Sequence, residues 1–188
     1  MSPPNEPAAL RVIATGGTFD KRYDPATGQL GFGTATRLSS LLAHARVDPM
    51  PAIETLMLID SLDMTDTHRE QIVQACRRAP EQAIVVVHGT DTMVETARVL
   101  AGAALDATIV ITGAMVPASI EHSDAVFNLG FAIACAQTLP RGVHIAAHGR
   151  VFPWDGVRKN RDAARFENQT RPASTASIAA AAASVSAS

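Results

Sequence analysis

Two threonines occupy positions from which a side chain can do chemistry. Thr18 and Thr90 each follow a glycine shortly after a run of apolar residues, Leu10–Ala14 and Ile84–Val87. A threonine hydroxyl is a weak nucleophile at neutral pH, so it needs a base or a polarising group beside it. A single threonine in such a turn most often hydrogen-bonds only the backbone. The pair matters only if the fold brings both together with an activating group.

Candidates for that group are Asp91, which adjoins Thr90, and Lys159, which follows the last predicted strand. A lysine that loses its hydration in a cleft also loses its proton more easily, and can then act as a base. We therefore predict that Lys159 returns to the threonines. The other basic residues of this segment are predicted to form a solvated helix face: Arg158, Arg161 and Arg165.

The histidines and cysteines favour structural roles. His88 ends a strand-like run, and a hydrogen-bonded core histidine is favoured there over a catalytic base. His144 and His148 lie four residues apart, a spacing that suits a metal only on a helix, and they follow a strand pattern. Cys76 and Cys135 sit in apolar patterns and are predicted to be buried free thiols. We expect no metal site and no cofactor.

Strand-like and helix-like patterns alternate along the chain. This alternation predicts an α/β fold with three layers, a mostly parallel sheet with helices on both faces, as in Rossmann-like and flavodoxin-like proteins. The turns after parallel strands emerge at one edge of the sheet, so Thr18 and Thr90 should face one crevice. The predicted strands are 10–14, 55–59, 84–87, 108–112 and 143–147. The first and third predicted helices span residues 36–45 and 93–104. The second begins at a Thr67–Glu70 capping box and ends near Pro80, and the fourth is capped by Ser123 or Asp124.

Composition limits the domain organisation, the partners and the location that the sequence allows. We expect a flexible arm at residues 1–9, one α/β domain at 10–171 with a mobile loop at 21–34, and a disordered Ala/Ser-rich tail at 172–188. A net charge of −2 argues against binding to nucleic acid or to an anionic membrane. We see no signal peptide and no transmembrane run, so the expected location is cytoplasmic.

Several motifs together resemble the bacterial-type L-asparaginase/glutaminase family. Thr15–Thr18 and His88–Thr92 resemble its two signature motifs. Further matches follow in the family's order between about Leu10 and Phe166: Asp60–Met64, Thr112–Met115 with Pro117, Phe127–Leu129, and Lys159. The resemblance implies hydrolysis of the side-chain amide of asparagine, or of a related small amide, to acid and ammonia through a threonine acyl-enzyme.

The resemblance also implies a role for each catalytic residue. Thr18 matches the primary nucleophile, which attacks the side-chain amide carbon. Thr90, Asp91 and Lys159 match a second hydroxyl–acid–base group that activates water or a nucleophile. These residue types supply what amide hydrolysis needs, namely a nucleophile and a proton shuttle.

Substrate binding is implied at the same turns. Asp91 and Ser61 match positions that hold the α-amino and α-carboxylate groups of an amino acid. The backbone amides of Gly17 and Gly89 would hold the ligand or a developing oxyanion. Tyr23 is the candidate for the tyrosine of the family's lid loop, although it lies closer to Thr18 than that tyrosine usually does.

The departures from the family keep other interpretations open. The family's usual chain has a C-terminal domain, so we expect only the N-terminal catalytic domain here, and Leu62 stands where many members have glutamine. One alternative is therefore a weak or inactive module that binds aspartate or a similar amino acid. A nucleotide-binding domain is disfavoured because the phosphate-loop and dinucleotide patterns are missing. We expect a homo-oligomer, dimer or tetramer, that covers an apolar face.

Overall fold

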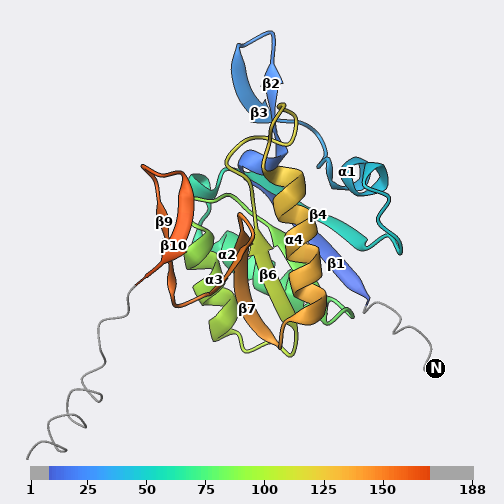
Figure 1. Cartoon of the computed structure of the whole chain (residues 1–188), viewed down its shortest axis with the longest axis vertical. Coiled ribbons are helices and arrows are strands. Elements are labelled where there is room, and N and C mark those ends of the chain that lie inside the picture. Colours follow the sequence, from blue (N-terminus) through green and yellow to red (C-terminus); the bar gives the residue numbers. More distant parts are fainter. Residues whose placement is uncertain (1–8, 170–188) are drawn as a thin grey trace, which may run out of the picture.

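A six-stranded sheet organises residues 9–169, which are the residues that the computed structural model describes (Figure 1). Its order is β4-β1-β5-β6-β7-β8, and all neighbouring pairs are parallel except β7 and β8. In that order the strands are Ala52–Ile59, Leu10–Gly16, Ala83–Val87, Thr108–Thr112, Gly142–Ala147 and Arg150–Pro153. The predicted, mostly parallel sheet is confirmed.

Helices cover both faces of the sheet, which confirms the three-layer prediction. Apolar residues of α2 and α3 join one buried cluster with one face of the strands. Apolar residues of α1 and α4 join a second cluster with the opposite face. The helices are α1 (Leu38–His44), α2 (Asp66–Arg78), α3 (Met93–Gly102) and α4 (Ala125–Thr138).

Strand β5 is the centre of this arrangement, because all five of its residues are buried. Ile84 and Val86 belong to one cluster, while Val85 and Val87 belong to the other. Alternate side chains of a strand point to opposite faces, so a continuous β-branched run is what a strand covered on both sides requires. The register pairs Val87 with Ala14 of β1 and with Thr112 of β6. The polar turns after these three strands therefore begin side by side.

The segment 21–34, predicted as a mobile loop, contains a hairpin. Strands β2 (Lys21–Asp24) and β3 (Gln29–Phe32) pair in antiparallel register and project from the sheet (Figure 1). The Asp24 carboxylate accepts hydrogen bonds from the Ala26 amide and the Thr27 hydroxyl, which closes the turn. Such local side-chain bonds stabilise turns that lack a hydrophobic pattern.

Helix α2 begins before the predicted Thr67–Glu70 box. Thr65 is the N-cap, and its hydroxyl accepts from the His68 amide while His68 Nδ1 accepts from the Thr65 amide. This is a capping box in which histidine takes the place of the usual acid or amide.

A second hairpin follows β8 in the chain, where the sequence predicts a helix with a solvated face. It consists of β9 (Val157–Asn160) and β10 (Arg165–Asn168). Val157 and Phe166 are buried in the cluster that α2 and α3 share, so the hairpin is held against that side of the sheet. Four-residue strands carry too little pattern to be separated from a loop by sequence alone.

The remaining predictions about chain organisation concern its ends. The expected tail at 172–188 lies outside the described residues, as does the expected arm apart from Ala9. Between residues 9 and 169, no helix has the length and apolar character that crossing a membrane requires. Cys76 and Cys135 are free and buried, as predicted.

Candidate active site

The turns that carry Thr18 and Thr90 touch through two glycines. Gly17 has φ of 70°, in the region that glycine adopts readily. A Cβ atom on Gly17 would lie 2.3 Å from the Gly89 Cα and 2.4 Å from the Gly89 amide nitrogen. The two backbones thus cross without room for a side chain. This contact brings Thr18 and Thr90, the next residue in each turn, to one crevice.

A third turn, after β4, closes on the same point. Ser61 is buried in the short helix η2 (Ser61–Asp63), and a Cβ on Gly89 would lie 2.5 Å from its Oγ. The Thr92 hydroxyl donates to the Ser61 carbonyl oxygen at 2.7 Å. Three predicted site segments therefore meet at the carboxyl edge of the sheet, where ligands bind in open α/β folds.

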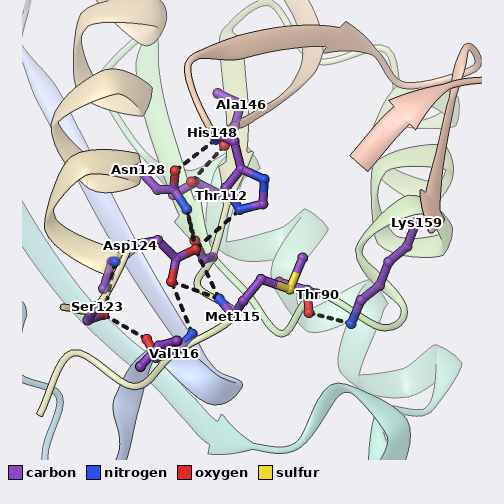
Figure 2. A network of polar contacts seen from close by, with 12 residues as sticks. Thr90, Thr112, Met115, Val116, Ser123, Asp124, Asn128, Ala146, His148 and Lys159 are labelled. Atoms are coloured by element: carbon purple, nitrogen blue, oxygen red, sulfur yellow. Dashed lines mark hydrogen bonds and ion pairs between the residues drawn. The ribbon is translucent and has the colours of Figure 1, made fainter. Parts of the chain in front are cut away.

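Lys159 reaches this edge from β9 (Figure 2). Its Nζ donates to Thr90 Oγ1 at 2.7 Å and to Asp91 Oδ1 at 3.0 Å. The Lys159 side chain is 15% exposed, and Thr90 is buried. The structure thus assembles the predicted hydroxyl, acid and amine from distant parts of the chain. In this geometry one proton can pass between the amine and the Thr90 hydroxyl.

Thr18 and Tyr23 follow the Gly17 turn along the chain. Thr18 begins the short helix η1 (Thr18–Asp20) and is half-buried. Tyr23 lies on β2 and is 60% exposed, on the projecting hairpin rather than in the crevice. The role predicted for the Gly17 amide is wrong, because that N–H already donates to the Ile59 carbonyl oxygen at 2.8 Å. Gly17 serves the site through close packing instead.

A second ion pair joins the hairpin to the η2 turn. Lys21 Nζ donates to Asp60 Oδ2, and Asp60 Oδ1 accepts from the Leu62 amide. The hydrogen bond from Lys21, followed by that from Leu62, lowers the pKa of Asp60, and the charge of Lys159 contributes in the same direction.

His88 lies directly beneath the crevice and is fully buried. Its Nε2 is 2.8 Å from the Thr96 hydroxyl, and its Nδ1 is 2.7 Å from the Gly89 carbonyl oxygen. Burial lowers the pKa of His88 to about 4, against the weaker opposing effect of the Gly89 carbonyl. This confirms the prediction of a core histidine, which supports the Gly89 turn from below.

The role of Asp124 is not apparent from the sequence. Its carboxylate accepts from the amides of Met115 and Val116 at 3.0–3.1 Å and from Asn128 Nδ2 at 2.9 Å (Figure 2). Asp124 is the N-cap residue of α4, but its side chain makes no capping hydrogen bond, and the Ser123 hydroxyl accepts from the Ala125 amide instead. The sequence shows only an acid before a helix, and such an acid predicts an N-cap as readily as a carboxylate that holds the Met115 and Val116 amides.

Asp124 and Asn128, here called the Asp124 clamp, support the crevice. Asn128 donates to the Gly113 carbonyl oxygen and accepts from the His148 amide, so it connects the turns after β6 and β7. Gly113 packs on the His88 carbonyl, where a Cβ would be only 2.2 Å away. The clamp therefore holds the turn that buttresses His88 and Gly89.

Comparison with known proteins identifies what the chain is similar to. A family model described as the N-terminal part of asparaginase matches residues 9–184. A glutamyl-tRNA(Gln) amidotransferase subunit of Aeropyrum pernix is 33% identical, with 79% of this chain and 37% of that protein covered. The probable periplasmic L-asparaginase of Haemophilus influenzae is 28% identical, with 80% and 46% covered. The chain thus spans between a third and a half of the length of these curated relatives.

Solved structures show the same fold. L-asparaginase I of Vibrio cholerae superposes with a TM-score of 0.74 at 24% identity, covering 88% of this chain and 52% of that one. The thermostable L-asparaginase of Thermococcus kodakarensis gives a TM-score of 0.73 at 24% identity, with 87% and 52% covered.

The contact between Gly17 and Gly89 predicts the effect of adding a single methyl group. We expect Gly17→Ala to lower the free energy of unfolding by more than about 2 kcal/mol, since φ is unfavourable for alanine and the Cβ meets backbone. Gly31→Ala is the control, because its Cβ would meet nothing within 4 Å, and it should change stability by less than about 0.5 kcal/mol. Urea unfolding measures both. Equal stability of the two variants would contradict the crossing.

The buried state of His88 predicts a loss of stability in weak acid. The unfolded histidine binds a proton below pH 6.5, whereas the folded one resists protonation until about pH 4. Stability due to His88 is therefore complete above about pH 6.5 and falls between about 6.5 and 4, by about 1.4 kcal/mol per pH unit. Urea unfolding at several pH values should show a shallower dependence for His88→Gln. The exposed His44→Gln should keep the wild-type slope, and an identical slope in both variants would refute the assignment.

Proposed function

The chain belongs to the asparaginase family, and we propose on that basis that it is an amidohydrolase with Thr18 as its nucleophile. The observation that carries the proposal is the contact of Lys159 with Thr90 and Asp91, beside the glycine crossing that presents Thr18. A nucleophile, a proton shuttle and an acid that orients it then occupy one crevice.

The first half of the proposed reaction transfers an acyl group to Thr18. Its hydroxyl oxygen forms a bond to the side-chain amide carbon, and the amide oxygen becomes an oxyanion. We assign the Gly89 amide, which lies at the contact with Gly17, as the donor to this oxyanion. The carbon–nitrogen bond then breaks, the nitrogen takes up the proton that the Thr18 hydroxyl has given up, and ammonia leaves an ester on Thr18.

The second half uses the Thr90 group. Lys159 accepts a proton from Thr90, which in turn takes one from a water molecule. The water oxygen bonds to the ester carbon, the bond from that carbon to the Thr18 oxygen breaks, and the proton taken from water passes back through Lys159 and Thr90 to restore the Thr18 hydroxyl. Asp91 holds the amine in place at 3.0 Å and stabilises it when charged. Ser61 and Asp91 are the proposed contacts for the rest of the substrate, and Tyr23 is carried by the hairpin as a lid residue.

Two amides are the first substrates to test. Three solved neighbours and one relative carry the name L-asparaginase, while other relatives are named as subunits of a glutamyl-tRNA(Gln) amidotransferase. Asparagine and glutamine should therefore be compared directly. The alternative, a module that binds aspartate with little turnover, is favoured by Leu62, which is 64% exposed and offers no polar group to a substrate.

Self-association is a second part of the proposal. Val126 and Phe127, at the start of α4, are large apolar residues that are 48% and 61% exposed. Apolar area of this kind favours contact with a second copy of the chain. For the compartment we propose the cytoplasm, because one solved relative is named the probable cytoplasmic L-asparaginase of Campylobacter jejuni.

Ammonia release tests the catalytic assignment. Purified protein should release ammonia from asparagine or glutamine, Thr18→Ala should abolish it, and Lys159→Met should lower kcat at least about a hundredfold because the proton shuttle is lost. Thr138→Ala, an exposed threonine on α4, is the matched control and should keep wild-type activity. Ammonia release that survives in Thr18→Ala would sink the proposal. Binding of aspartate by calorimetry without any turnover would favour the binding module instead.

Sedimentation velocity tests self-association. The wild-type chain at micromolar concentration should sediment as a dimer or larger species. Phe127→Asp should shift it toward the monomer, because a charge in the contact is costly to desolvate. Glu121→Gln, which alters an exposed charge before α4, is the control. A wild-type protein that is monomeric would contradict this part of the proposal.

A further inference from the structure

The two edges of the central sheet differ in how they are protected. Strand β8 ends the sheet on one side, is four residues long, begins with Arg150 and ends with Pro153. Short length, charge and proline are the devices by which an edge strand avoids pairing with another chain. Strand β4 ends the sheet on the other side and is eight residues long, and its last five residues, Thr55–Ile59, include neither a charge nor a proline. Among residues 9–169, β4 pairs only with β1, so its outer backbone groups have no strand neighbour.

The side chains at the β4 edge are only partly covered. Thr55 is exposed, and the four apolar residues after it are half-buried. A hollow of about 570 Å³ lies between Leu56 and α2. From α2 it is lined by six exposed polar or charged residues, of which the first is Asp66 and the last is Arg78. An open apolar strand edge and a polar helix stripe therefore form one continuous surface.

The charges of this surface are arranged to fit a second copy of it. Asp66 is the first residue of α2 and Arg78 is the last, so the stripe is acidic at one end and basic at the other. A two-fold axis at the middle of β4 makes the β4 strands of two copies antiparallel, and it makes their α2 helices antiparallel as well. Asp66 of each copy then faces Arg78 of the other, so opposite charges meet twice in a dimer.

The partners of these charges within the chain leave them able to make such a contact. Asp66 accepts from Arg69 through one carboxylate oxygen, and Arg78 donates to Glu54 from one of its nitrogens. A carboxylate has a second oxygen that accepts, and a guanidinium group carries five N–H donors. A second copy of the chain supplies both a strand of equal length and charges of the matching sign. It is therefore the occupant that this surface fits best.

We propose that β4 and α2 form a two-fold interface between two copies of this chain, in which the β4 strands pair edge to edge and the two sheets become one. Main-chain hydrogen bonds supply affinity in this kind of pairing, and the α2 charges select the antiparallel alignment. The interface lies away from α4, which packs against β5, β6 and β7. It goes beyond the proposed function, because it involves neither the catalytic residues nor the α4 contact. A chain that uses both contacts assembles beyond a dimer.

Sedimentation velocity in the Phe127→Asp background isolates this interface from the α4 contact. That variant should still sediment as a dimer at micromolar concentration. Asp66→Lys and Arg78→Glu, each added alone, should raise the dissociation constant about tenfold, because like charges then meet twice. An equal mixture of these two proteins should dimerise again, since the introduced lysine meets the introduced glutamate. Arg77→Glu is the control, because it makes the same charge change on an exposed residue outside the stripe and should leave the dimer intact.

Hydrogen exchange locates the contact in the same proteins. The amides of Thr55–Ile59 should exchange more slowly as the concentration of the Phe127→Asp variant rises through the range of dimerisation, whereas those of β8 should not change. A monomeric Phe127→Asp variant would mean that something other than a second copy covers β4, and it would overturn the inference. A dimer that neither charge reversal weakens, or in which exchange at β4 does not slow, would also overturn it. None of these readouts uses ammonia release, so failure of the proposed function leaves them unaffected.

Discussion

The site depends on a crossing of two backbones that leaves no space for a side chain. Gly17 and Gly89 meet within the distance that a single Cβ would occupy, and Ser61 packs on Gly89 from the third turn. Only glycine permits both the positive φ of Gly17 and the contact itself. The parallel register of β1, β5 and β6 places these turns at one edge. The crossing then converts neighbouring turns into one crevice with a threonine on each side.

The layer beneath the crevice keeps this crossing in place without adding charge to the core. His88 is buried and satisfied by Thr96 and by the Gly89 carbonyl, and burial keeps it neutral. A charged group at this depth would be costly to desolvate. The charges of the site are therefore at the rim, where Lys159, Asp91 and Asp60 are partly solvated.

Whether a feature can be predicted depends on how far apart in the sequence the residues that determine it lie. The β-branched run of β5 predicts a strand buried on both faces, because that pattern is local, and the alternation of elements then predicts the sheet and its crevice. Lys159 is predicted by its place after the last predicted strand and by the family resemblance. The β2–β3 hairpin and the Thr65 cap escape prediction because their signals are single hydrogen bonds. The contacts of Asp124 escape it because their partners come from other parts of the chain.

The two halves of the site differ in what holds them. Thr18 and Thr90 stand on turns of the central sheet, so their positions are fixed by the largest buried clusters of the described chain. Lys159 belongs to a two-stranded hairpin whose buried apolar contacts come from Val157 and Phe166. Changes along this hairpin alter charge at the crevice while the sheet keeps its core. The proposed nucleophile is thus tied to the central sheet, whereas the charge of Lys159 is carried by a smaller element packed against it.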